Sequence, residues 1–207
     1  MKYQNSNFLN RMFLWSIPLC FFCAGAGMLM LLKVVNAEGN FYTRIQSESS
    51  AWIIAHVILL MGSILLLPAS IGIRSLITNR KPGYLANIMV PIVAISGALL
   101  SGQYAIDFLM PEIARLGGEA HEIHRFLSTD GLVSMLFYNL PELSSLGLLI
   151  MSIALVWDER IGKTLSYVLI INWLVVILGN LVAIEIQRIA LFVLGITFFF
   201  IIRSLKD

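Results

Sequence analysis

The residues that could do chemistry lie inside long apolar stretches, and Glu142 is the clearest of them. It follows Tyr138 and Pro141 within the apolar run 131–157. Tyr138 and Glu142 are four residues apart, so a helix places them on one face. If the run starts at the outer membrane boundary, Glu142 lies roughly 17 Å deep in a hydrocarbon core about 30 Å thick. A carboxylate at that depth must be protonated, paired or in contact with water, so we predict a functional role for it.

Other polar side chains in the apolar stretches are predicted to lie in the same, outer half of the membrane. His56 occurs near the start of the second stretch, and Gln103 and Asp107 share a face near the end of the third. Each could instead hydrogen-bond a neighbouring helix, and His56 could hold a ligand, a proton or a metal ion. We predict a polar cavity that is open to the outside and closed toward the cytoplasm, lined by His56, Gln103, Asp107, Tyr138, Asn139, Glu142 and Asn180.

The segment between the third and fourth stretches contains a weak metal-binding pattern. His121 and His124 are three residues apart and are accompanied by Glu119 and Glu122. On a helix the two histidines share a face, and imidazole and carboxylate groups suit zinc or another divalent transition metal. A solvated polar face explains the same pattern. We favour the absence of a cofactor, with zinc bound by His121 and His124 as the alternative.

Several signatures of catalysis are absent from the sequence. It has no phosphate-binding glycine loop, no G-x-S-x-G nucleophile elbow and no H-E-x-x-H metalloprotease motif. Cys20 and Cys23 form a C-x-x-C pattern, but leucine and phenylalanine surround them, and an apolar environment keeps a thiol unreactive. The formal net charge of +2 is too small to indicate nucleic-acid binding.

Composition predicts a membrane protein. Hydrophobic residues make up 58% and charged residues 13% of the 207 residues, whereas a soluble domain is about 45–50% apolar and about 25% charged. Spans of about 20 apolar residues account for most of the chain, so no room is left for a separate soluble domain. We predict an all-α polytopic membrane protein with a single transmembrane domain, residues 1–207. It is a bundle of six transmembrane helices with spans at 12–33, 51–73, 84–110, 131–157, 164–179 and 181–203.

The distribution of Lys and Arg predicts the orientation. Nine of the 14 basic residues fall on the side of the two termini and five on the other side. The positive-inside rule therefore makes both termini cytoplasmic and places the loops 34–50 and 111–130 outside. The first apolar run, from Met12 to Leu32, is longer than the core of a signal peptide and lacks a convincing cleavage site, so we expect a retained span. We expect an integral protein of a bacterial cytoplasmic membrane.

The fifth and sixth predicted spans form a tight helical hairpin. Gly179-Asn180 is the strongest turn signal between them, and a turn at 185–188 is the alternative. Glu185 and Arg188 are spaced i,i+3, so we expect them to pair with each other.

Small and polar residues predict how the helices pack. Gly97 and Ser101 have the small-x-x-x-small spacing that allows helices to approach closely, either within one chain or across a homodimer. Asn172 is expected to hydrogen-bond a neighbouring helix. The first four spans each contain a proline, and we expect these residues to bend the helices.

Three functions fit these features. The first is a small permease or solute- or ion-binding protein with an outward-facing site, supported by Glu142 and by the one-sided distribution of polar groups. The second is a non-catalytic membrane partner, sensor or immunity-type subunit, in which the polar groups only connect helices. The third is a membrane-embedded metal-dependent hydrolase, with His56, Asp107 and the loop histidines His121 and His124 as metal ligands and Glu142 as the base. We favour the first, whose partners are the lipid bilayer and a small-molecule or ion ligand.

Overall fold

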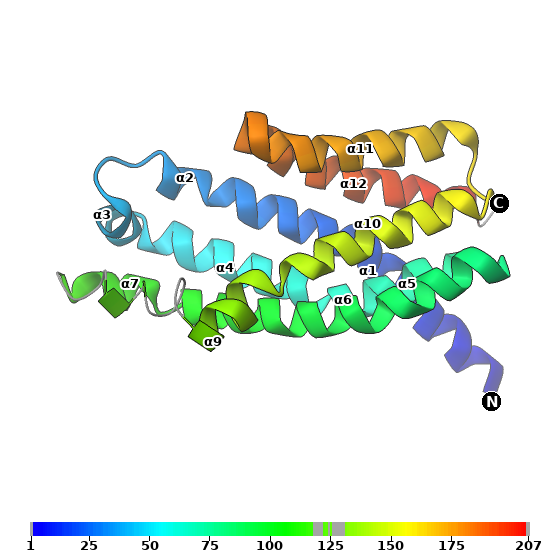
Figure 1. Ribbon diagram of the computed structural model, residues 1–207, viewed down its shortest axis with the longest axis horizontal. Coiled ribbons are helices and arrows are strands. Elements are labelled where there is room, and N and C mark those ends of the chain that lie inside the picture. The colour runs from blue at the N-terminus through cyan, green and yellow to red at the C-terminus, as the bar shows by residue number, and fades with distance from the viewer. Residues whose placement is uncertain (1, 118–121, 124, 126–130, 206–207) are drawn as a thin grey trace.

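The chain is helical throughout the part that the structure describes, which confirms the all-α prediction. The computed structural model describes residues 2–117, 122–123, 125 and 131–205, and these contain no strand. The long helices run side by side along one axis (Figure 1). In chain order the helices are α1 (Lys2–Met30), α2 (Leu32–Val35), α3 (Phe41–Ser47), α4 (Ser49–Ile64), α5 (Leu66–Leu76), α6 (Arg80–Asp107), α7 (Met110–Arg115), α9 (Gly131–Ser134), the π-helix η1 (Met135–Asn139), α10 (Glu142–Trp157), α11 (Lys163–Val182) and α12 (Ile184–Ser204).

Four helical segments in the described part are long and apolar enough to cross a membrane. They are Phe8–Val35, Arg80–Arg115, Gly131–Trp157 and Glu185–Ser204. A fifth is counted if α3 and α4, which meet at an angle of 90°, form one bent span. The remaining apolar helices, Leu66–Leu76 and Lys163–Gly179, are shorter. These apolar helices suggest a membrane protein, and six membrane crossings stay a prediction.

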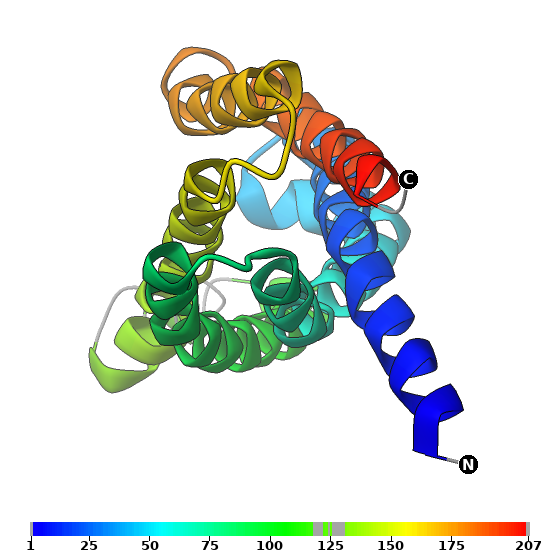
Figure 2. The same cartoon turned by 90° about the vertical axis from the view of Figure 1, so that its right-hand side faces the viewer.

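The helices form a bundle with both chain ends on one side. The start of α1 and the end of α12 lie at the same end, called here the terminal end, and α3 and α7 lie at the opposite, distal end (Figure 1). Viewed from the terminal end, α1, α5, α6, α10, α11 and α12 are arranged in a ring (Figure 2). In this ring α1 packs against α5 and α12, and α10 packs mainly against α6, while α4 covers α1 and α6 at the distal end.

The second predicted span, residues 51–73, is divided between two helices in the structure. Helix α4 ends at Ile64 and α5 begins at Leu66. Pro68 has no backbone N–H to donate to the carbonyl of Ile64, so the helical hydrogen-bond ladder is interrupted there. The ladder resumes when the backbone N–H of Ala69 donates to the carbonyl of Leu65 at 2.9 Å.

The fifth and sixth predicted spans meet at Ala183, three residues later than the predicted turn. Ala183 has an extended backbone (φ −158°, ψ 121°) between α11 and α12. Gly179 matters for a different reason: a Cβ there would lie 2.8 Å from the backbone nitrogen of Gln187. Glycine therefore permits the close crossing of the two helices and does not itself form the turn.

Polar and small residues connect the helices within the chain, as predicted. The Asn172 side chain donates to the Thr197 hydroxyl at 2.9 Å, between α11 and α12. A Cβ added at Gly97 would lie 3.0 Å from the Cβ of Leu66, so α5 and α6 approach closely at this glycine. The hydroxyls of Ser63 and Ser101 lie 2.8 Å apart beside it. Small residues here serve packing inside one chain.

Asp158 connects the end of α10 to the loop after α5 by hydrogen bonds at the terminal end. Its side chain is buried and accepts hydrogen bonds from the backbone nitrogens of Thr78 at 3.0 Å and Asn79 at 2.6 Å. The Thr78 hydroxyl donates to the same carboxylate at 3.2 Å. The loop after α5 is thus held against the end of α10, which fixes how α6 starts relative to α10.

Candidate functional site

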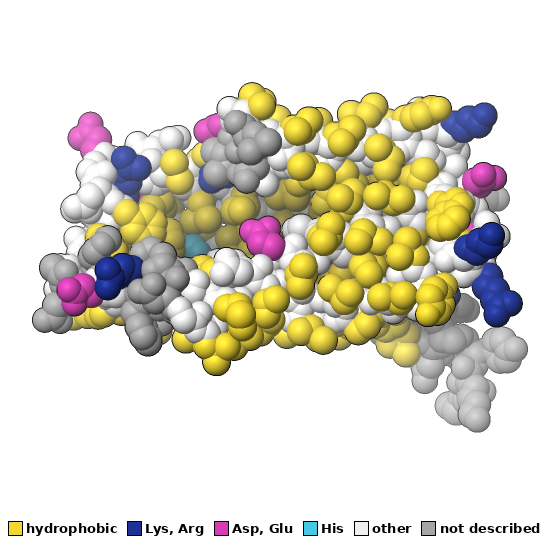
Figure 3. Space-filling model, viewed as in Figure 1, with side chains coloured by type: hydrophobic (Ala, Val, Ile, Leu, Met, Phe, Trp, Pro, Cys, Tyr) yellow, Lys and Arg dark blue, Asp and Glu magenta, His cyan; other side chains and the backbone are white. Residues whose placement is uncertain are grey.

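A central cavity lies inside the ring of helices. Its volume is about 280 Å³, and its walls come from α1, α4, α5, α6, η1, α10, α11 and α12. In a space-filling view this face has a recess toward the distal end, in which a histidine side chain is visible (Figure 3). Most of the wall is apolar. The polar side chains that line it include Ser63, Gln103, Tyr104, Tyr138, Glu142 and Gln187.

Glu142 stands at the mouth of this cavity. Its side chain is exposed and lines both the central cavity and a second recess of about 320 Å³ between α10 and α11. Figure 3 shows an acidic side chain among hydrophobic ones on this face, at the edge of the hollow. Glu142 is the single Asp, Glu, Lys or Arg among the described residues that line either space. The site therefore carries one negative charge when this carboxyl group is ionised.

The backbone just before Glu142 is irregular, and this irregularity places Glu142. Residues Met135–Asn139 form the π-helix η1, in which the backbone nitrogen of Leu140 donates to the carbonyl of Met135 at 3.0 Å. Pro141 follows and cannot continue the ladder because it has no N–H. Helix α10 starts afresh at Glu142. Short π-helical turns occur frequently at functional sites.

Aromatic rings form much of the cavity wall. Phe21 and Trp173 contact each other edge to face, with ring centroids 6.0 Å apart, and Tyr104 and Tyr138 line the cavity from α6 and η1. The indole nitrogen of Trp173 donates to the Ser152 hydroxyl at 2.9 Å, which fixes the orientation of the ring. The wall is therefore rich in aromatic side chains, and at least the Trp173 ring is held in place by a hydrogen bond.

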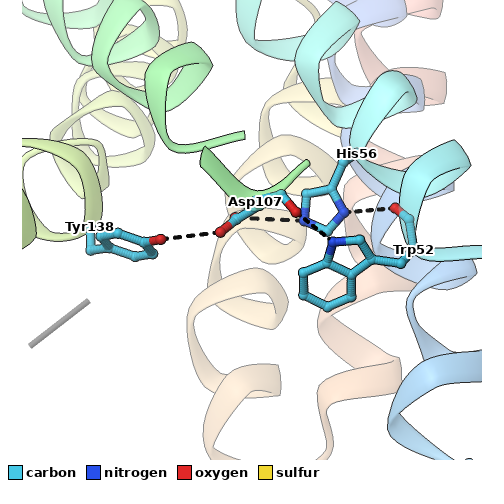
Figure 4. Close-up of polar contacts among 4 residues, drawn as sticks. All are labelled: Trp52, His56, Asp107 and Tyr138. Carbon is cyan, nitrogen blue, oxygen red and sulfur yellow. Dashed lines mark hydrogen bonds and ion pairs between the residues drawn. The ribbon is translucent and has the colours of Figure 1, made fainter. Parts of the chain in front are cut away.

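A polar network adjoins the cavity at the distal side (Figure 4). The Tyr138 hydroxyl donates to Oδ1 of Asp107 at 3.1 Å, and Nε2 of His56 lies 3.6 Å from Oδ2 of the same carboxylate. Nδ1 of His56 lies 2.7 Å from the backbone carbonyl of Trp52. The indole of Trp52 donates to the backbone carbonyl of Asp107 at 2.7 Å, which ties α4 to the end of α6.

The structure brings together some of the predicted site residues. Gln103, Tyr138 and Glu142 line the cavity, while His56 and Asp107 lie behind Tyr138 in the polar network. The remaining predictions concern residues placed elsewhere or not described. Asn139 is exposed and is not among the lining residues, and the side chains of Asn180, His121 and His124 lie outside the described part.

The expected depth of Glu142 can also be counted from the other end of α10. From Glu142 to Trp157, a helix is about 22 Å long at 1.5 Å per residue. If Trp157 marks the membrane boundary at the terminal end, Glu142 lies about 8 Å from the distal boundary of a core about 30 Å thick. Glu142 is then shallower than the count from residue 131 predicted.

The described part of the chain offers no ready metal site. Within it, no group of three or more His, Cys, Asp or Glu side chains is arranged to hold a metal ion. Zinc binding by His121 and His124 stays a prediction, because both residues fall outside that part.

Arg188 corrects one prediction. Its side chain is 3% exposed, and Nε and Nη1 have no hydrogen-bond partner. Glu185 is exposed and forms no ion pair with it among the described residues. The expected i,i+3 salt bridge is therefore not formed between these two residues, of which Arg188 is buried and Glu185 exposed.

Several residues of the site were not predicted from the sequence, among them Trp52 and Gln187. The indole of Trp52 donates to the backbone carbonyl of Asp107, and its own carbonyl lies 2.7 Å from Nδ1 of His56. Gln187 lines the cavity from the first turn of α12. The sequence does indicate this position of Gln187, since an amide side chain within an apolar helix usually faces the bundle or a cavity.

Comparison with known proteins gives no relative: no family model, no curated protein and no solved structure matches this chain.

Proposed function

We propose that this chain is a small six-span membrane protein, a permease or solute-binding protein, whose central cavity takes a compact organic cation. One observation carries the proposal: the cavity is mostly apolar and Glu142 is the one charged side chain among the described residues that line it. In an environment of low dielectric constant, a lone carboxylate favours a cationic partner.

The shape and chemistry of the wall support this ligand class. A volume of about 280 Å³ is at the small end of the range of ligand pockets, about 300–1,000 Å³. The aromatic side chains of Phe21, Tyr104, Tyr138 and Trp173 line the cavity, and aromatic rings attract an ammonium group through cation–π interaction. In a compact amine with an apolar body, the ammonium group pairs with the carboxylate and the aromatic rings. The apolar body contacts the apolar wall.

The arrangement of the helices supports the proposed topology. Both chain ends lie at the terminal end (Figure 1), as an even number of crossings requires. Lys and Arg gather at the ends of the molecule, and hydrophobic side chains cover the middle of the visible face (Figure 3). With the terminal end cytoplasmic, the recess beside Glu142 faces the outer half of the membrane.

Tags at each terminus, probed in intact cells, test this orientation. Labelling of either terminus from outside would contradict it.

The ligand class is tested by thermal unfolding of the purified protein with three probes of similar size: benzylammonium, benzyl alcohol and benzoate. A ligand that binds only the folded state raises Tm in proportion to its saturation. We expect benzylammonium to raise Tm and benzoate to leave it unchanged. Glu142→Gln keeps the shape but removes the charge, and it should weaken benzylammonium binding about 10- to 100-fold. Glu185→Gln, an exposed acidic position outside the cavity, is the matched control. Equal stabilisation by benzoate, or an unchanged response in Glu142→Gln, contradicts the proposal.

A non-catalytic membrane partner or sensor is the second candidate. Polar side chains such as Asn172 with Thr197, and Trp173 with Ser152, already connect helices without any ligand. The same screen separates the two candidates, because a protein whose polar groups only connect helices gains no stability from any of the three probes.

A further inference from the structure

The protons of His56 are fixed by its hydrogen bonds. Nδ1 lies 2.7 Å from the backbone carbonyl of Trp52, and a carbonyl oxygen can only accept, so Nδ1 carries a hydrogen. In a neutral imidazole the other nitrogen, Nε2, then has a lone pair. That lone pair faces Oδ2 of Asp107 across 3.6 Å. With a neutral His56, two hydrogen-bond acceptors, Nε2 and Oδ2, would therefore face each other.

The other hydrogen-bond donors near Asp107 do not donate to Oδ2. The Tyr138 hydroxyl donates to Oδ1, and the Trp52 indole donates to the backbone carbonyl of Asp107 and not to its carboxylate. Oδ2 therefore faces only Nε2 within this network (Figure 4). Both residues are buried: His56 is 3% exposed and Asp107 9%. Burial makes a contact between two acceptors costly, because water cannot relieve it.

We propose that His56 and Asp107 form a binding site for one proton, coupled through Tyr138 to the cavity. The bound proton resides on Nε2 and gives an imidazolium–carboxylate pair. The hydrogen bond from Tyr138 to Oδ1 supports this assignment, because it stabilises the ionised form of the carboxyl group. Release of the proton leaves the pair with a net charge of −1.

Few other ionisable groups face this pair. Tyr104 of α6 lies beside the imidazole, with ring centroids 5.9 Å apart, and Glu142 of α10 lines the cavity that Tyr104 and Tyr138 also line. Helix α1 contributes Cys20 to that wall. No described Lys or Arg forms an ion pair with Asp107. The charge of the pair is thus set by its own proton and not by a nearby cation.

Tyr138 couples the proton to the cavity. It belongs to η1, whose irregular backbone leads directly into Glu142, and its ring lines the cavity while its hydroxyl holds Asp107. A change in charge at Asp107 alters the strength of this hydrogen bond. Proton binding on the distal side therefore biases the position of η1 and the potential that a ligand experiences in the cavity.

The test is ¹⁵N NMR of histidine, which reports the protonation of Nδ1 and Nε2 separately. The chain has three histidines, so the variant His121→Gln/His124→Gln leaves His56 as the single signal. We expect both nitrogens to be protonated at low pH and Nε2 alone to lose its proton as the pH rises. Observation of a neutral His56 with the proton on Nε2 and none on Nδ1 overturns the proposal.

A second measurement tests the role of Asp107. In an Asp107→Asn background the carboxylate charge is gone, so we expect Nε2 to bind its proton about tenfold more weakly than in the unchanged pair. An unchanged titration overturns the shared site. Neither measurement involves a solute: normal titration with no benzylammonium binding would leave the proton site standing and contradict the proposed function alone.

Discussion

The Tyr138 hydroxyl donates to the Asp107 carboxylate across 3.1 Å, and this bond joins η1 to the end of α6. The two residues are 31 positions apart in the sequence. The segment between them includes residues that the structure does not describe, and this contact ties the distal start of the apolar segment Gly131–Trp157 to α6. It also links the cavity wall to the carboxylate that faces His56.

Removal of the Tyr138 hydroxyl should lower stability modestly. A hydrogen bond to a charged acceptor contributes about 1.5–3 kcal/mol when buried, and Tyr138 is only half-buried, so we expect a loss of about 1 kcal/mol in Tyr138→Phe. The measurement is thermal unfolding in detergent, extended to the cycle with Asp107→Asn. The losses should be less than additive, because each substitution breaks the same bond. Strict additivity would show that the bond contributes nothing.

Asp158 should be a strong determinant of folding at the terminal end. Asp158→Asn replaces one acceptor oxygen by an NH₂ group, which then faces an N–H or O–H donor in the loop after α5. We expect a loss of about 2 kcal/mol in unfolding free energy. Glu159→Gln, the exposed neighbour, is the matched control and should change stability by less than about 0.5 kcal/mol. Equal effects of the two substitutions would refute the role of the buried carboxylate.

Gly72 should tolerate no side chain. A Cβ there would collide with the backbone carbonyl of Phe13 in α1, and backbone atoms cannot move aside as the end of a side chain can. Gly72→Ala should therefore cost about 1–3 kcal/mol by overpacking. Gly162→Ala, where nothing lies within 4 Å of the new Cβ, is the control and should be neutral or slightly stabilising. Equal unfolding temperatures for the two variants would contradict the contact between α1 and α5.

Ligand binding should depend on the proton site. When His56 loses its proton, the His56–Asp107 pair becomes negative, and a cation in the cavity is bound more tightly. The affinity for benzylammonium should therefore rise with pH across the titration of His56 seen by NMR. In His56→Gln the pair has no proton to release from an imidazole, so this rise should disappear while binding itself persists. The measurement is benzylammonium affinity against pH for both proteins. A rise in affinity that persists in the variant would show that the His56 proton does not control ligand binding.

The sequence predicted the helical fold because periodicity and hydropathy are local properties. It also identified Tyr138 and Glu142 together, since a helical spacing of four residues survives the π-helical turn well enough to keep both on the cavity. The break at Leu65 was foreseeable from Pro68, although proline in a membrane helix bends some helices and divides others.

Tertiary contacts account for what the sequence did not predict. The position of the α11–α12 turn at Ala183 depends on how closely the helices cross at Gly179. The missing salt bridge between Arg188 and Glu185 goes with the burial of Arg188 in the bundle while Glu185 stays exposed. Trp52 has the same sequence signal whether it marks a membrane boundary or, as here, donates to a buried carbonyl.

Glu142 lines a recess between α10 and α11 as well as the central cavity, and the outward sides of these two helices carry exposed Leu146, Ile153, Ile171 and Leu178. In the proposed topology this recess opens sideways to the acyl chains. A ligand that takes this route is supplied by the bilayer, so its concentration at Glu142 is its aqueous concentration multiplied by its lipid–water partition coefficient. Each buried CH₂ is worth about 0.8 kcal/mol, so two extra methylenes enrich an amine in the lipid about 15-fold. Among homologous amines, apparent affinity measured in vesicles should then rise with chain length more steeply than affinity measured in detergent.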